Sequence, residues 1–397
     1  MKSLLVISFC AIALQATAQP LDLNEALSTA SQNRASIKAA QARVEQAKLH
    51  ARSLGTLSPL SLGAGASSNQ AIGGADDDLY ISQPLDLFGK GRANRRLGEA
   101  GVEEAKTKLR AARLDLQVEV LEAYFEAVAA SELSQAADQL LSVAEALRLA
   151  TRRRFEEGKV PEVQVTRSTI ELDRAKQAAS MRKANLKAAL KRLAGAMGQS
   201  ETHFEVNLAA ILQKPVAFAI TERTDLLLLK NEVKAAEAEA GIASASLRPD
   251  LEVRAMRSPW GDSEGIYGGR IQLTWSLFDH GKSRLESQAA RKKAEAAKRN
   301  YEDAELKAKA ELSAVETEIE SAQSQVSSYL EIANLARDLV SRSQLGYSEG
   351  VGTLIDVLEA TRSLREVEQE RAEAKLQLNK SWIQFYQTTG TLLEAMK

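Results

Sequence analysis

The chain repeats itself along its length, and this internal repeat restricts the possible fold more than any other feature. The segment ISQPLDLFGKGR at 81–92 is echoed by IQLTWSLFDHGKSR at 271–284, where the two Leu-Phe pairs lie 190 positions apart. A second pair, RFEEGKVPEV at 154–163 and GYSEGVGTLI at 346–355, lies at a shift of 192. The 397 residues are therefore predicted to contain two copies of one structural unit.

Each copy is predicted to contain a helix, two strands, a very long helix, a tight turn and a final helix. In the strand at 271–277, apolar Ile, Leu, Trp and Leu alternate with polar residues, which is typical of a half-buried strand. The first repeat is expected at 19–215, with strands near 59–70 and 79–88 and a turn at 157–162. The second is expected at 216–397, with strands near 250–258 and 268–278 and a turn at 349–353.

The long helices are predicted at 92–156 and 282–348, because these stretches are rich in Ala, Lys and Glu and lack Pro. At a rise of 1.5 Å per residue, each would be about 100 Å long. In the second, Leu312, Ile319, Val326, Ala333 and Val340 recur every seven residues, which indicates a coiled-coil seam. The shorter helices predicted at 24–54, with Asn24 as its cap, and at 163–195 would lie end to end beside the first long helix.

Residues 1–18 resemble a secretory signal peptide, with Lys2, an apolar run and small residues before the expected cut after Ala18. Cys10 lies within this segment, so the mature chain is expected to lack cysteine. No later segment approaches eighteen consecutive apolar residues, so a transmembrane helix is not expected.

The sequence contains no pattern typical of an enzyme or of a cofactor site. His50, His203 and His280 lack metal-binding spacing, and Gly281-Lys282-Ser283 lacks the first glycine of a phosphate-binding loop. Lys and Arg are interleaved with Asp and Glu, so no nucleic-acid surface is expected. We therefore expect neither catalysis nor a bound cofactor or metal.

The four strands alternate apolar and polar residues, which fits strands between lipid and water but also fits soluble hairpins on a small sheet. Four strands cannot close a barrel, and an open edge is unfavourable in lipid. A membrane interpretation therefore requires oligomers, with eight strands from two chains or twelve from three. Only the larger barrel would leave a lumen.

The two helix-to-helix turns are the best candidates for a functional site. Gly350 is expected to end the second long helix, and Thr353 with Asp356 forms a capping-box pattern for the return helix. Glu359 lies on the same helix face as Asp356, so three chains could bring these carboxylates together as a gate. Acidic first-turn residues also occur as simple caps. Both interpretations remain open from the residues alone.

The repeat, the two strand-to-helix junctions and above all GYSEGVGTLIDVLEATRSL at 346–364 resemble the TolC-like outer membrane efflux family. This resemblance implies a trimer with a twelve-stranded outer membrane barrel above a long periplasmic helical tunnel. It also implies two protein partners, a periplasmic adaptor and an inner-membrane transporter. Asp356 and Glu359 match the acidic constriction of that family, and Tyr347 matches a tyrosine of its closed aperture. Gln164 replaces a tip aspartate, and Gly352 replaces an arginine, so the closed-state bonds must differ.

The same resemblance implies that the hairpin tips contact the adaptor, through Gly158, Val160 and Pro161 in the first turn and Gly350, Gly352 and Thr353 in the second. The function expected is a passive exit channel in the outer membrane. The alternative is a periplasmic coiled-coil adaptor or scaffold that does not enter the membrane.

Overall fold

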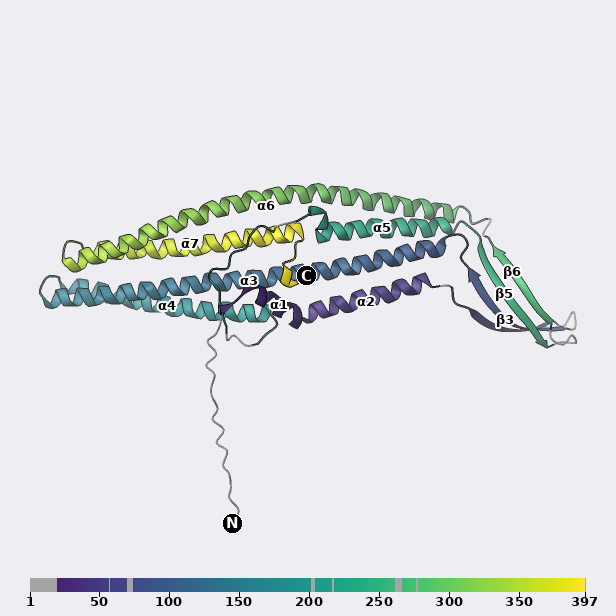
Figure 1. Ribbon diagram of the computed structural model, residues 1–397, viewed down its shortest axis with the longest axis horizontal. Coiled ribbons are helices and arrows are strands. Elements are labelled where there is room, and N and C mark those ends of the chain that lie inside the picture. The colour runs from purple at the N-terminus through teal and green to yellow at the C-terminus, as the bar shows by residue number, and fades with distance from the viewer. Residues whose placement is uncertain are drawn as a thin grey trace, which may run out of the picture.

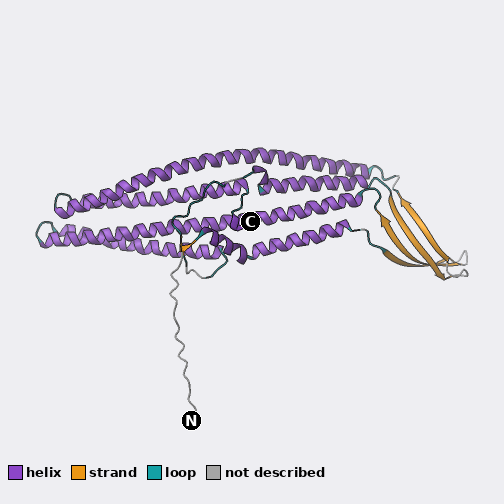
Figure 2. Cartoon of the chain, viewed as in Figure 1, coloured by secondary structure: helices purple, strands orange, loops and turns teal. Residues whose placement is uncertain are grey.

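The computed structural model describes residues 20–56, 58–69, 74–200, 204–215, 218–260, 266–275 and 278–396. Long helices form most of the molecule, and a sheet lies at one end of them (Figure 2). The mostly helical fold with a small β part is therefore confirmed. The expected signal peptide, with Cys10, lies outside the described residues, as do His203 and Leu277.

The elements follow one another as β1 (Pro20–Leu21), α1 (Leu23–Asn33), α2 (Ala35–Gly55), β2 (Ser61–Asn69), β3 (Gly74–Leu85), α3 (Lys90–Glu156), α4 (Glu162–Ala196), β4 (Glu205–Val206), η1 (Ile220–Glu222), α5 (Thr224–Ala245), β5 (Asp250–Trp260), β6 (Ile266–Thr274), α6 (Lys282–Glu349), α7 (Leu354–Thr389) and η2 (Glu394–Met396). Within the described residues, no helix has the length and apolar character needed to cross a membrane.

Two very long helices, α3 with 67 residues and α6 with 68, form the frame of the molecule. Helix α3 packs against α2, α4, α5 and α7, and α6 packs against α5 and α7 (Figure 1). The shorter helices lie in line, α2 with α4 and α5 with α7, alongside the long ones. The predicted pairing of two short helices with one long helix is thus confirmed.

Apolar heptad positions form the seams between these helices. The predicted seam of α6 is buried at Ile319, Ala333 and Val340, while Leu312 and Val326 are half-buried against the main core. The largest core lies near mid-length, where β1, β4 and the C-terminal segment meet α3 and α7. Its largest fully buried side chains include Tyr124, Phe125 and Phe385.

The predicted helix at 24–54 is wrong as a single helix, because the chain breaks at Arg34, which has extended backbone angles. Its guanidinium bonds to Glu119 at 2.8 Å and to the Gly195 carbonyl at 3.3 Å, and these contacts accompany the bend. The break lets α1 bury Leu27 completely in the main core. The cap of α1 is Asp22 rather than the predicted Asn24.

The sheet has the antiparallel strand order β2-β3-β5-β6, so the two hairpins join through β3 and β5. Strand β3 begins at Gly74, earlier than predicted, because its first residue pairs with Asn69 of β2. Strand β6 ends at Thr274, earlier than predicted. Thr274 pairs with Asp250, and the preceding Pro249 has no N–H to continue the ladder.

One face of this sheet is apolar and open to solvent. Leu62 and Ile271 on this face are each 75% accessible, and on β6 the polar residues Gln272 and Thr274 of the opposite face are exposed as well. Polar side chains interact on the sheet, where the Arg254 guanidinium lies 4.3 Å from the Tyr80 ring centroid and bonds to Glu252 at 3.2 Å. Water-soluble sheets usually bury their apolar face instead.

Candidate gate at the helix tips

The α3–α4 and α6–α7 turns lie together at the end of the molecule opposite the sheet (Figure 1). In the first turn, Gly158 has a φ of +72° and donates its N–H to the Phe155 carbonyl at 2.9 Å. Helix α4 then begins after Pro161, whose extended backbone serves as the N-cap. The turn thus reverses the chain within a few residues.

In the second turn, Gly350 has a φ of +87° and ends α6, as the sequence predicts. The amides of Val351 and Gly352 both donate to the Gly346 carbonyl at 2.9 Å. A Cβ on Gly352 would lie only 3.2 Å from the backbone carbon of Gly346 and the nitrogen of Tyr347. A side chain at position 352 would therefore require the Gly346–Tyr347 backbone to shift by a few tenths of an ångström.

Helix α7 begins with a complete capping box. The Thr353 N–H and hydroxyl both donate to Asp356 Oδ2 at 2.8 Å, and the Asp356 N–H donates to Thr353 Oγ1 at 3.3 Å. These hydrogen bonds, first from the Thr353 backbone and then from its side chain, lower the pKa of the exposed Asp356 carboxyl below its usual 3.8. Asp356 therefore carries a negative charge at neutral pH, and its cap bonds weaken only when acid protonates it.

Tyr347 connects three helices at the tip. Its side chain is 2% accessible, and its hydroxyl lies 3.1 Å from Thr151 Oγ1 and 3.3 Å from Gln164 Oε1. The Thr151 hydroxyl donates to the Leu147 carbonyl at 2.8 Å. Thr151 Oγ1 and Gln164 Oε1 are therefore both acceptors that share the single phenolic proton of Tyr347. One phenol thereby joins the end of α6 to α3 and α4.

Arg154 completes this contact, and the sequence analysis did not identify it. Its Nη1 donates to the Tyr347 carbonyl at 2.5 Å, and its guanidinium carbon lies 4.7 Å from the Tyr347 ring centroid. A cation at the C-terminal end of a helix is favourable, because it meets the free carbonyl groups of the last turn. Arg154 is far from Tyr347 in sequence, so its position next to the first turn is the one sequence feature that indicates a contact with the second turn.

The predicted gate residues are thus placed in two groups. Tyr347 and Gln164 are in direct contact. Asp356 is engaged by its cap, whereas Glu359, one helical turn further, is exposed and has no hydrogen-bond or ion-pair partner among the described residues. Both carboxylates therefore lie on the accessible side of α7, where a neighbouring molecule could approach them.

The predicted adaptor contacts are mostly accessible. Gly158, Pro161, Gly350 and Thr353 are exposed, Gly352 is half-buried, and Val160 is 9% accessible. Three apolar side chains that the sequence analysis did not single out extend from these turns, namely Val163, Val351 and Ile355 at 60%, 85% and 51% accessibility. Apolar residues inside an otherwise polar turn are the signal that would have found them.

Throughout the described part of the chain, no group of three or more His, Cys, Asp or Glu side chains is arranged to hold a metal ion. The tip instead offers hydrogen bonds, an accessible carboxylate pair and apolar turn residues. The apolar turn residues suit contact with another protein, and the carboxylate pair suits the attraction of cations.

Comparison with known proteins assigns the family. A model described as outer membrane efflux protein matches residues 26–199 and 218–391, one stretch in each predicted repeat. The chain belongs to the outer membrane efflux protein family.

Two curated relatives are each 24% identical to the chain. Nodulation protein T of Rhizobium leguminosarum bv. trifolii aligns over 78% of this chain and 69% of its own length. The nickel-cobalt-cadmium resistance protein NccC of Alcaligenes xylosoxydans xylosoxydans aligns over 54% of this chain and 47% of its own, so the match spans about half of that protein.

Solved structures share the fold. The outer-membrane channel OprN matches with a TM-score of 0.74 and 21% identity, covering 93% of this chain and 89% of its own. The outer membrane protein VceC of Vibrio cholerae matches with a TM-score of 0.75 and 20% identity, covering 93% of this chain and 96% of its own. CusC matches with a TM-score of 0.75 and 17% identity, covering 94% of this chain and 92% of its own.

Proposed function

We propose that three copies of this chain form a passive exit channel in the outer membrane. The strands of the trimer form a twelve-stranded barrel, and the helices form a tunnel that extends into the periplasm. A periplasmic adaptor binds the helix tips and connects the channel to an inner-membrane transporter. The transporter supplies the energy, and this protein supplies the path.

The exposed apolar face of the sheet carries this proposal. Leu62, Ile271 and Leu273 present apolar surface outward, at 75%, 75% and 59% accessibility. Exposed apolar surface on a sheet is unfavourable in water but favourable against lipid tails. A scaffold that stays in the periplasm would have no use for this surface.

The sheet edges support the oligomer. Strands β2 and β6 each pair with a single neighbour in the four-stranded sheet, so each has an unpaired side. Unpaired backbone groups are costly in lipid, and pairing β6 of one chain with β2 of the next would satisfy them. Three chains of four strands give twelve, which is enough to enclose a lumen.

The first experiment is to fractionate cells that produce the full chain and to test the membrane-bound protein on gels with and without heating. We expect it in the outer membrane fraction as a heat-labile trimer that conducts ions in planar bilayers. A soluble monomer or dimer would instead favour the periplasmic scaffold.

A matched pair of substitutions tests the direction of the sheet faces. We expect Ile271→Arg to destabilise membrane assembly by about 2 to 4 kcal/mol, because Ile271 is exposed on the apolar face near the middle of β6, where the proposed barrel would place the charge in lipid. Gln272→Arg changes the adjacent residue, which faces the lumen in the proposed barrel, and should be tolerated. Trimer yield and heat stability measure the difference, and equal tolerance of the two substitutions would contradict the membrane assignment.

A further inference from the structure

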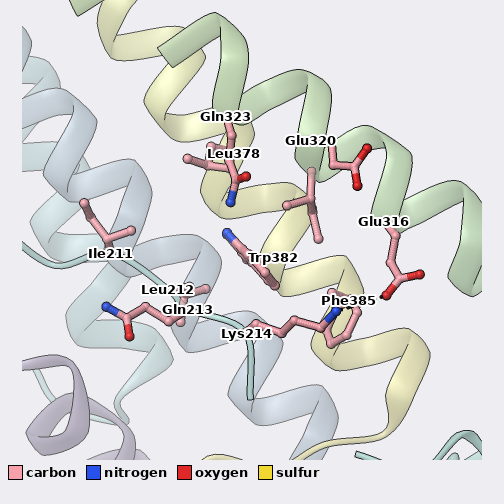
Figure 3. A pocket seen from close by; sticks show the side chains of 11 residues that line it. Ile211, Leu212, Gln213, Lys214, Glu316, Glu320, Gln323, Leu378, Trp382 and Phe385 are labelled. Atoms are coloured by element: carbon pink, nitrogen blue, oxygen red, sulfur yellow. Dashed lines mark hydrogen bonds and ion pairs between the residues drawn. The ribbon is translucent and has the colours of Figure 1, made fainter. Parts of the chain in front are cut away.

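A pocket of about 560 Å³ lies at mid-length between α6, α7 and the segment 211–214 (Figure 3). This volume is within the usual range for small-molecule sites. Leu378 and Phe385 of α7 and Ile319 of α6 form its apolar walls, at 8%, 0% and 5% accessibility. The pocket is remote from the tips and from the sheet, so the channel function proposed above does not require it.

The side chain of Trp382 gives this pocket a specific polar contact point. The residue is 6% accessible, and its indole N–H has no hydrogen-bond acceptor among the described residues, although this nitrogen is not among the fully buried atoms that lack a partner. The N–H is therefore open to the pocket, and since indole N–H groups usually find a partner, an acceptor within the pocket can supply it. Figure 3 shows the Trp382 and Gln323 side chains directed into the same pocket, where a ligand acceptor would meet them.

The charges at the rim favour a cation. Lys214 Nζ lies 6.0 Å from the Phe385 ring centroid and 3.3 Å from Glu316 Oε1, so the charge of this lysine is balanced by Glu316. Glu320 also lines the pocket and has no ion-pair or hydrogen-bond partner among the residues that the structure describes. The Glu320 carboxylate therefore remains unpaired at the pocket and can attract a positive group.

We propose that this pocket binds an amphipathic organic cation of small-molecule size. Its apolar rings lie against Phe385 and Leu378, an acceptor such as a carbonyl takes the Trp382 N–H, and its cationic nitrogen faces Glu320. Binding there involves no covalent chemistry.

The test uses the purified full-length protein in a non-ionic detergent and the cationic dye rhodamine 6G, whose ester provides an acceptor. Fluorescence anisotropy should show saturable binding. We expect Trp382→Phe, which keeps an aromatic ring but removes the N–H, to weaken binding by about 2- to 10-fold. Glu320→Gln should weaken it by about 2- to 5-fold, because a partly solvated charge pair is lost.

Two controls separate this site from general dye adsorption. Glu318→Gln removes an exposed carboxylate from the same helix outside the pocket and should leave binding unchanged. Fluorescein, an anionic dye with a related ring system, should bind more weakly and should not respond to Glu320→Gln. Equal affinity of all variants, non-saturable binding or no binding at all would overturn the proposal, including the case in which a neighbouring chain covers the pocket. Trimer formation and conductance measured on the same samples test the channel function separately.

Discussion

Replacing Glu368 with Ala is expected to destabilise the helical part of the protein by about 2 to 3 kcal/mol, because it removes the buried carboxylate that accepts charge-assisted hydrogen bonds from two arginines. Glu368 is 5% accessible and accepts from Arg337 of α6 and, at 3.0 Å, from Arg371 of α7. The same network reaches α3, where Lys375 bonds to Glu132 at 2.5 Å. This alternating series of charges joins α3, α6 and α7.

Denaturation with guanidinium, followed by the helical circular dichroism signal, measures this loss. Glu366→Ala is the matched control, since Glu366 lies on the same helix and pairs with Arg362 at 3.1 Å on an exposed surface. Exposed pairs contribute little, so this control should change stability by less than about 1 kcal/mol. Equal effects of the two substitutions would show that the buried network does not stabilise the helices.

A double replacement, Glu368→Leu with Arg371→Leu, distinguishes the cost of an unpaired charge from the value of the pair. Apolar residues of similar size often restore the stability of a buried ion pair. The remaining cation, Arg337, is 42% accessible and can be hydrated, and Glu132 keeps Lys375. We therefore expect the double variant to recover most of the stability that Glu368→Ala loses.

The long-range order of the fold could be predicted because it is periodic. Residues seven positions apart, such as Ile319, Val326 and Ala333, define the α6 seam without knowledge of its partner. The repeated junctions likewise locate the two hairpins. Patterns of this kind depend only on neighbours along the chain, so the sequence contains them in full.

The features that could not be predicted depend on residues far apart in sequence. The break at Arg34 accompanies contacts with Glu119 and Gly195, and the end of β6 reflects Pro249, which directly precedes the neighbouring strand β5. Likewise, Glu368 resembles any surface carboxylate of a charged helix until α3 and α6 enclose it. Local periodicity carries no information about such contacts.

In the candidate gate, too, some features follow from local sequence patterns and others depend on contacts between distant residues. The turn glycines and the Thr353–Asp356 cap follow from local patterns. The bond between Tyr347 and Gln164 and the contact of Arg154 with Tyr347 join separate repeats, so they required the structure. The convergence of Asp356 and Glu359 from three chains remains a prediction.

If these carboxylates converge, replacing both with their amides, Asp356→Asn and Glu359→Gln, should remove the cation selectivity of the channel. Six like charges in a narrow opening would raise the local concentration of cations and repel anions. The Thr353 hydrogen bonds lower the pKa of the Asp356 carboxyl, so its contribution to the wild-type selectivity should be lost only in strong acid. Single-channel recordings in planar bilayers with a salt gradient give the reversal potential that measures this selectivity.

The alternative is that Asp356 only caps α7, and Thr353→Ala is the control that separates the two roles. This change removes the hydroxyl that caps the Asp356 amide, at a cost of about 1 kcal/mol, but retains all six carboxylates. A gate predicts that Thr353→Ala lowers the thermal stability while the reversal potential stays at its wild-type value. The double amide variant should instead change the reversal potential, to a value near zero, while the trimer still assembles. An unaltered reversal potential in that variant would leave Asp356 and Glu359 as helix-start residues and would place the constriction elsewhere in the tunnel.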